Sequence, residues 1–362
     1  MNDAVTLRVN GVDYGGWKEV EISAGIERQA RDFSLAVTRN WPGETDIPRR
    51  VKPGDVCEVW IGSDKLLTGY VDSTPVSYDA KQVNVGVRGR SKTADLIDCS
   101  AEHKTGQWRG VKIERIAADL AKPYGISVIA EASTGAAIAE HQIQPGETAF
   151  ECIDRLLTLR QMLATDDADG RLVFIKAGSG GRAATALKLG ENIKEADAAL
   201  DNKDVFSKYT VSGQRSGNDY DSGSAVAESA KTIADAKASR YRNLIIRQSG
   251  QVDSAICADR ARYEFLYRKA KALETVYTVQ GWRQQDGRLW LPNQMAHVVD
   301  PVIGFDHWML IVEAVYRLGD GGTTCTLKVG PIDGYMPTPE VAKKKKSSGA
   351  SADNSNYNWV NF

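Results

Sequence analysis

Two regions of the sequence share one order of turns and alternating apolar segments, and they lie far apart in the chain. Each begins with a proline turn, at Pro53-Gly54-Asp55 in the first region and at Pro292-Asn293-Gln294 in the second. The predicted strands that follow lie at 56–61, 66–71, 76–79 and 83–87, and then at 295–298, 309–312, 315–320 and 324–329. Few residues are identical, so two generic meanders with similar loop lengths remain the alternative to a duplication. A duplication predicts that the two backbones superpose strand by strand, with Pro53 and Pro292 in equivalent turns.

The first 95 residues alternate between apolar and polar side chains in short segments separated by turn residues. Clear examples lie at 5–9, 33–37, 56–61 and 83–87. A period of two is typical of antiparallel strands that bury one face. Residues 1–95 are therefore predicted to form a first β-barrel or a small sandwich.

Helical spacing replaces this alternation after residue 111. One apolar stripe consists of Ile113, Ile116, Ala117, Leu120 and Ala121. Pro123 ends that helix, and a second helix is expected after Pro145-Gly146. An apolar strand at 172–175 follows. These patterns predict a mixed α/β insert domain over residues 96–190.

Residues 191–335 are predicted to form the second β-barrel, with a long helix between its strands. The apolar positions of that helix are Ile256, Tyr263, Leu266, Tyr267, Ala270 and Leu273. Near 214–239 the chain is rich in Ser, Gly, Asp and Ala, which predicts an exposed loop. The fold class is thus mainly β, with two similar antiparallel β-barrel domains and a mixed α/β domain.

The last segment, residues 336–362, is predicted to be a flexible basic C-terminal arm with an apolar tip. Burying each large apolar side chain of the tip is worth about 1.5 to 3 kcal/mol, so we expect the tip to dock on another surface. The lysine run favours an acidic partner or nucleic acid, or it is a solvated tail. The candidate assembly contacts are Tyr357, Trp359, Phe362, Lys343, Lys344, Lys345 and Lys346.

The charge balance argues against a protein whose main task is to neutralise nucleic-acid phosphate. The chain has 46 Lys and Arg against 47 Asp and Glu, a net charge of −1, whereas such proteins are usually strongly basic.

No apolar stretch is long enough to span a membrane, and we expect no membrane insertion. The five cysteines are widely spaced and odd in number, which favours reduced core thiols.

Motifs for catalysis, cofactors and metals are missing from the sequence. The four histidines do not occur in a metal-ligand spacing, and the glycine-rich run at 178–181 lacks the Lys-Ser/Thr of a phosphate loop. The acidic run at 166–170 would place Thr165 and Lys176 where a calcium loop needs carboxylates, so a hairpin turn is favoured there. We therefore predict a protein that is not an enzyme and has no cofactor, catalytic residue or metal site.

Several longer segments, in the same order along the chain, resemble the baseplate hub proteins of Mu-type bacteriophages. They lie at 69–73, 87–100, 106–108, 116–125, 189–192, 209–211 and 286–293. The resemblance extends from about residue 5 to residue 336, and the late control protein D family and the hub part of type VI secretion spikes are related to it. The lysine run resembles the family's basic tail, whereas the tip at 357–362 has no counterpart in the resemblance.

This resemblance implies a structural hub of a contractile-tail baseplate. The implied assembly is a homotrimeric ring that joins the sixfold tail tube to the threefold spike. Its partners would be the spike protein, the tail tube protein and other baseplate proteins, and phage DNA would pass through its channel without specific binding. The implied location is the tail baseplate of a virion, assembled in the host cytoplasm; phage, bacteriocin and prophage particles are all compatible.

Two other functions remain open at this point. A tail-associated receptor or glycan-binding module would also be rich in β-structure, and it could present Trp17, Trp41, Trp60 or Trp282 to a sugar, although core or interface positions are more usual for tryptophan. A cell-wall hydrolase is the second alternative, but the resemblance covers almost all of the chain and leaves little room for an added catalytic domain.

Overall fold

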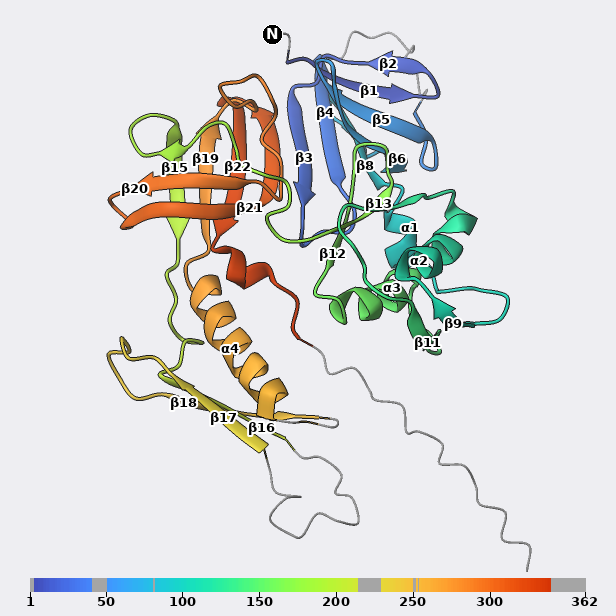
Figure 1. Ribbon diagram of the computed structural model, residues 1–362. Helices are drawn as coiled ribbons and strands as arrows, with labels where there is room; N and C mark the ends of the chain where they lie inside the picture. Colours follow the sequence, from blue (N-terminus) through green and yellow to red (C-terminus); the bar gives the residue numbers. More distant parts are fainter. Residues whose placement is uncertain are drawn as a thin grey trace, which may run out of the picture.

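The computed structural model describes residues 3–40, 51–80, 82–213, 229–249, 252 and 254–339. Figure 1 shows two β units side by side, a helical insert beside the first unit, and an extension that projects away from the second. The mainly β class predicted from the sequence is confirmed. Among the described residues, no helix combines the length and the apolar composition needed to cross a membrane.

The first β unit is entirely antiparallel, with the spatial order β3-β4-β8-β6-β5-β1-β2 and with β7 beside β8. Alternation buries one face of the longer strands, as in β1, where the first, third and fifth residues are buried. The strands are β1 (Val5–Val9), β2 (Val12–Tyr14), β3 (Glu19–Gly25), β4 (Asp32–Asn40), β5 (Val56–Ile61), β6 (Asp64–Ser73), β7 (Val76–Tyr78) and β8 (Gln82–Ser91).

The second β unit has the spatial order β15-β19-β22-β21-β20-β14. Its pairings are antiparallel except for the short parallel contact between β14 and β20. The strands are β14 (Leu187–Lys188), β15 (Ile193–Ala198), β19 (Thr275–Gln280), β20 (Met295–Asp300), β21 (Phe305–Gly319) and β22 (Gly322–Gly330). Since β14 pairs here, the predicted insert boundary at residue 190 is too late.

Strand β21 also pairs with β3, and this contact, called the seam below, joins the two units into one hydrogen-bonded path. A single apolar cluster extends through both units and contains Leu7, Ile22, Leu35, Tyr277 and Tyr316. The pairings of the described strands do not close either unit into a separate barrel. The continuous sheet is the reason, because β3 and β21 each use the edge that barrel closure would need.

The insert has its own core, in which α2 and α3 pack on each other and on short strands. Both predicted helices are present, and Thr148 and Glu151 form a capping box at the start of α3. The elements are α1 (Ala94–Asp98), β9 (Gln107–Val111), α2 (Ile113–Ala121), the 3-10 turn Lys122–Tyr124, β10 (Val128–Ala130), β11 (Ile138–Gln142), α3 (Ala149–Thr158), β12 (Leu163–Asp166) and β13 (Leu172–Ile175).

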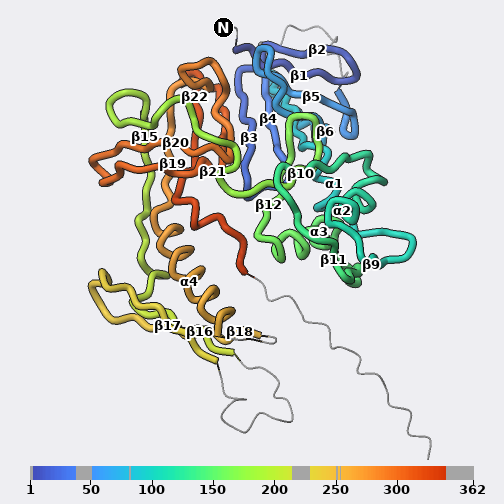
Figure 2. The backbone as a smooth tube through the Cα atoms, viewed as in Figure 1, coloured from blue at the N-terminus to red at the C-terminus, as the bar shows by residue number. Residues whose placement is uncertain are grey.

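Residues between β15 and β19 form a separate unit, called the sheet–helix extension below. Its small sheet has the order β17-β16-β18 and packs one face on α4 (Figure 2). The elements are β16 (Lys208–Gly213), β17 (Ser229–Ala234), β18 (Asn243–Gln248) and α4 (Ser254–Lys271). A 3-10 turn at Ile332–Tyr335 then packs against α4.

Two sequence predictions are corrected by this extension. The exposed loop expected near 214–239 is wrong for residues 229–234, which form β17; residues 214–228 lie outside the described part. Strand β16 was expected in the second β-barrel but belongs to the small sheet, where Tyr209 and Val211 are buried. Alternation identifies the buried side chains of a strand but not the sheet that receives them.

Candidate assembly interface

The two β units contain the same five-strand arrangement. Strands β3, β4, β8, β6 and β5 are neighbours in that spatial order, and β15, β19, β22, β21 and β20 have the matching order. The five strands also follow the same order along the chain in both units. The similar order of turns and strands predicted from the sequence is therefore present in the fold.

The two proline turns have the same backbone conformation and the same hydrogen bonds. After Pro53, Gly54 has φ of 90°, and after Pro292, Asn293 has φ of 68°. The N–H of Gly54 donates to the Val71 carbonyl at 2.7 Å, and the N–H of Asn293 donates to the Ile311 carbonyl at 2.8 Å. Glycine and asparagine tolerate this left-handed region best, which explains their presence after each proline.

A shared bulge sets a constant numerical offset between the copies. The β6–β8 ladder shifts between Val71 and Ser73, and the β21–β22 ladder shifts between Ile311 and Glu313. Beyond the bulge, Val76 lies opposite Val85 and Tyr316 lies opposite Cys325. Adding 240 to a residue number in β6, β7 or β8 thus gives the equivalent position in β21 or β22 in this part of the ladder.

The seam between the units combines a strand ladder with ion pairs. Tyr316 lies opposite Ile22, and both side chains are fully buried. On the exposed face, Arg317 Nε lies 3.0 Å from Glu21 Oε2. At the other end of the ladder, Arg28 Nε lies 2.6 Å from Glu313 Oε1. The seam therefore has an apolar face and a charged face, as expected for a permanent contact.

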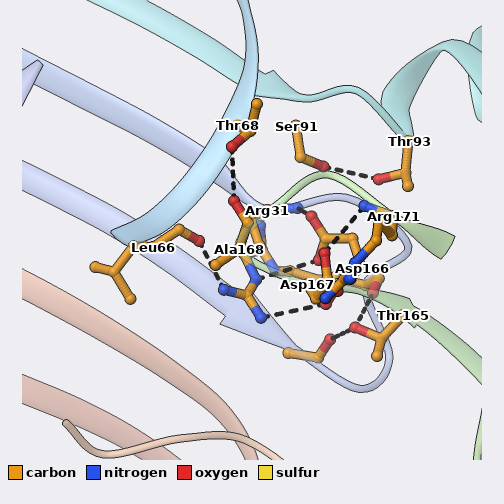
Figure 3. Close-up of polar contacts among 12 residues, drawn as sticks. Arg31, Leu66, Thr68, Ser91, Thr93, Thr165, Asp166, Asp167, Ala168 and Arg171 are labelled. Carbon is orange, nitrogen blue, oxygen red and sulfur yellow. Dashed lines mark hydrogen bonds and ion pairs between the residues drawn. The ribbon is translucent and has the colours of Figure 1, made fainter. Parts of the chain in front are cut away.

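A mostly buried arginine holds the insert to the first β unit (Figure 3). Arg31 Nη1 donates to the Leu66 carbonyl at 2.6 Å, and Nη2 donates to the Asp166 carbonyl at 3.2 Å. Its Nε lies 3.3 Å from Asp166 Oδ1, and its main-chain N–H donates to Asp166 Oδ2 at 3.0 Å. Thr68 Oγ1 adds a bond to the Ala168 carbonyl at 2.8 Å. This polar cluster fixes the insert relative to the strands that carry the seam.

Burial dominates the electrostatics of Asp166. Desolvation raises the pKa of its carboxyl, and the Arg31 guanidinium opposes that shift. Only 1% of the Asp166 side chain is exposed, and 14% of the Arg31 side chain. The two residues are 135 positions apart, so no local pattern could have predicted their contact.

The sheet–helix extension carries a second buried carboxylate and an uncovered sheet face. Glu264 of α4 accepts from Arg260 Nη2 at 2.7 Å and from Arg268 Nε at 2.8 Å, one turn away on each side. On β18, Ile245 is exposed, and so is the nearby Tyr241. The extension thus leaves apolar side chains exposed on and beside a small sheet whose other face packs on α4 and Val252.

A histidine and a cysteine meet in the insert, but they are not arranged as a nucleophilic pair. His141 Nε2 lies 3.2 Å from Cys152 Sγ and 3.1 Å from the Cys152 carbonyl oxygen. Burial raises the pKa of the Cys152 thiol to about 12 and lowers the pKa of His141. A reactive cysteine needs a lowered pKa, so this thiol stays protonated.

A cavity of about 380 Å³ lies where the first unit meets the insert, and Tyr70, Asp72, Arg90 and Asp95 help to line it. Arg90 is already paired, with Nε 2.8 Å from Asp72 Oδ2 and Nη2 2.7 Å from Asp98 Oδ2. Its guanidinium is therefore committed to structural contacts. In the described part of the chain, no group of three or more His, Cys, Asp or Glu side chains could hold a metal ion.

The tryptophans considered for sugar binding are mostly engaged. Trp282 is buried, and its Nε1 donates to the carbonyl oxygens of Arg317 and Thr324. Trp60 is partly buried, and the Arg8 and Lys65 cations both lie over its ring. Trp17 packs against the main core, and Trp41 lies outside the described residues.

The assembly contacts predicted from the sequence lie outside the described residues. These are Tyr357, Trp359, Phe362, Lys343, Lys344, Lys345 and Lys346. The described chain reaches Pro339, and Thr338 Oγ1 donates to the Tyr263 hydroxyl of α4 at 3.2 Å. Sequence reasoning did not identify the seam or the Arg31–Asp166 contact, because both join segments that are distant in the chain.

Three family models match parts of the chain. Residues 4–91 match the N-terminal domain of Mu phage baseplate assembly protein GpP-like proteins, and residues 93–176 match the second domain of baseplate hub protein gp44-like proteins. Residues 253–338 match the fourth domain of Mu phage baseplate assembly protein GpP.

Individual proteins match over almost the whole chain. The baseplate hub protein gp44 of Escherichia phage Mu is 33% identical over 361 residues, which is 97% of this chain and 94% of that protein. The crystal structure of the 43 kDa tail protein of prophage MuSo2 from Shewanella oneidensis is similar with a TM-score of 0.83 and 32% identity, and covers 93% of this chain and 100% of its own. The E. coli type VI secretion component c3393 shares the fold alone, with a TM-score of 0.55, 12% identity, and coverage of 92% and 79%.

Proposed function

Because the chain belongs to the family of Mu-type phage baseplate hub proteins, a family with a structural role in the tail baseplate, we propose that three copies form the central ring of a contractile-tail baseplate. The ring joins a sixfold tail tube on one side to a threefold spike on the other, and it contacts further baseplate proteins. It is assembled in the host cytoplasm before it becomes part of the virion. The protein acts as scaffold and not as enzyme.

The observation that carries this proposal is the duplication joined by the seam. A ring of three copies presents six similar five-strand modules on one face. The α/β insert and the sheet–helix extension each occur only three times in the same ring. Closed rings repeat an interface by rotation, so a duplicated module lets one subunit meet sixfold and threefold partners without strain.

We also propose that DNA passes through this ring without being bound specifically. The net charge of −1 supports this, since a channel that neutralised many phosphates would hold the DNA in place. A receptor- or glycan-binding role is less well supported, because Trp282 is buried and the Trp60 ring already contacts the Arg8 and Lys65 cations. A hydrolase role is less well supported, because the relative that matches 97% of this chain is a baseplate hub protein.

Ring formation is the direct test. The full-length protein, alone or with the spike protein of its particle, is expected to form a complex containing three chains of 39.5 kDa each. Light scattering gives the mass, and electron microscopy is expected to show a hollow threefold particle. A protein that stays monomeric both alone and with the spike protein would overturn the proposal. Glycan binding or peptidoglycan clearing by that monomer would favour one of the two alternative functions instead.

The C-terminal arm is proposed to strengthen contacts in the assembly. Deleting residues 340–362 is expected to leave the melting temperature unchanged and to weaken assembly with the spike. Burying Trp359 and Phe362 is worth about 1.5 to 3 kcal/mol each, so W359A and F362A should each weaken binding about tenfold or more. Replacing Lys343 to Lys346 by glutamine provides a matched variant that keeps the apolar tip. Added salt should weaken only the contribution of the lysine charges, so the salt dependence of assembly separates it from the contribution of the tip. Unchanged assembly after the deletion would show that the arm is incidental.

A further inference from the structure

We propose that strand β7 of one copy pairs with strand β15 of the next copy, in a register that repeats the internal seam. This inference rests on the proposed ring and names its subunit contact. In the predicted antiparallel ladder, Val76 lies opposite Ala198 of the partner subunit, Ser77 opposite Asp197 of the partner subunit, and Tyr78 opposite Ala196 of the partner subunit.

Strand β7 is the counterpart of the seam-forming part of β21. In the seam, Tyr316, Arg317 and Leu318 lie opposite Ile22, Glu21 and Val20. The offset of 240 makes Val76, Ser77 and Tyr78 the equivalents of the first three residues. The pairing on the other side of each strand agrees with this. Val76, Ser77 and Tyr78 pair with residues 85, 84 and 83 of β8, and their equivalents in β21 pair with residues 325, 324 and 323 of β22.

Strand β15 is the counterpart of β3. Val87 and Leu327 are equivalent by the offset of 240; Leu35 lies opposite Val87 and Tyr277 lies opposite Leu327, so Leu35 and Tyr277 are equivalent. On the other side, Leu35 lies opposite Val20 and Tyr277 lies opposite Ala196. It follows that Val20, Glu21 and Ile22 correspond to 196, 197 and 198, which sets the register of the proposed ladder.

Both proposed partners are edge strands whose outer side has no strand neighbour among the described residues. Val76 is 45% exposed and Tyr78 is 78% exposed, whereas Tyr316, the equivalent of Val76, is fully buried beside β3. Residues 194–197 of β15 are exposed, while Val20 and Ile22 of β3 are buried. An edge strand with exposed apolar residues is a template for pairing with another chain.

The chemistry of the two edges is complementary in this register. Val76 and Tyr78 share one face of β7, and they would meet Ala196 and Ala198 of the partner subunit, which are small and apolar. On the other face Ser77 would meet Asp197 of the partner subunit, so a hydroxyl donor stands opposite a carboxylate acceptor. A shift of one residue would set Asp197 among the apolar side chains, which disfavours other registers.

Disulfide trapping tests the register. Directly opposed residues in an antiparallel pair have Cα atoms about 4.5 to 5.5 Å apart, within the range a disulfide spans, whereas a shift of two residues gives about 7 Å or more. The full-length double variants S77C/D197C and V76C/A198C are therefore made, since neighbouring pairs alternate in geometry and one of the two suits a disulfide better. The mismatched variant S77C/E195C and the single-cysteine variants are the matched controls.

On mild oxidation in the presence of the spike protein, at least one matched double variant is expected to give covalent trimers at ten times or more the yield of the mismatched variant. Native gels and light scattering of the same samples report ring formation independently. A threefold ring without register-specific cross-links would overturn the β7–β15 pairing and leave the proposed ring intact. A protein that stays monomeric would overturn both.

Discussion

Replacing Asp166 with alanine is expected to lower the free energy of unfolding by about 3 to 5 kcal/mol. The substitution leaves the mostly buried Arg31 guanidinium without its carboxylate and leaves the Arg31 main-chain N–H without an acceptor. An uncompensated charge in a place of low polarity costs far more than an exposed ion pair gains. The effect is expected both in stability and in the docking of the insert.

Asp169 provides the matched control for this substitution. It lies three residues further on in the same turn and pairs with Lys65, but its side chain is half exposed. D169A is therefore expected to cost less than about 1 kcal/mol. D166N, which retains an oxygen acceptor, should fall between the two. Urea denaturation measures the three losses, and a D166A loss as small as that of D169A would contradict the structural role given to the buried pair.

Replacing Gly69 with alanine is expected to destabilise the first β unit by about 3 kcal/mol or more. A Cβ atom at Gly69 would lie 1.9 Å from the Arg90 carbonyl oxygen and 2.6 Å from the Ser91 Cα, both on strand β8. Because these are main-chain atoms, β6 and β8 would have to separate. Denaturation should report the loss, and hydrogen exchange should rise in β8.

Gly319 at the end of β21 is a suitable control for that variant. No heavy atom lies within 4 Å of a Cβ built there, and its φ is not in the left-handed region. G319A is thus expected to change stability by about 0.5 kcal/mol or less. Equal effects of G69A and G319A would show that the close approach of β6 and β8 is readily relaxed.

Local patterns in the sequence predicted the elements better than their partners. The stripe containing Ile113 and Leu120 correctly predicted α2, and the proline turns correctly marked the starts of β5 and β20. These features depend on residues within one or two turns of each other. The correspondence between the strands of the two units was also predicted, because it follows from the repeated order of turns and segments along the chain.

Contacts between distant segments could not be predicted in this way. The alternation of β16 is the same whether Tyr209 and Val211 face a barrel core or α4, and the structure places them against α4 and its neighbours. Predicting the seam requires the information that residues 313–318 lie beside β3. Predicting the Arg31–Asp166 pair requires the information how the insert docks on the first β unit. Such information resides in the packing of the whole chain.

The two additions to the duplicated module occur at different points in the two copies. The α/β insert follows β8 of the first unit, whereas the sheet–helix extension separates β15 from β19, where the first unit has only the short link between β3 and β4. In a ring of six modules, each odd module would therefore be decorated differently from each even one. The difference between the two halves would then set two periodicities in one ring. The duplicated modules would repeat every sixth of a turn, while the insert and the extension would each repeat every third of a turn.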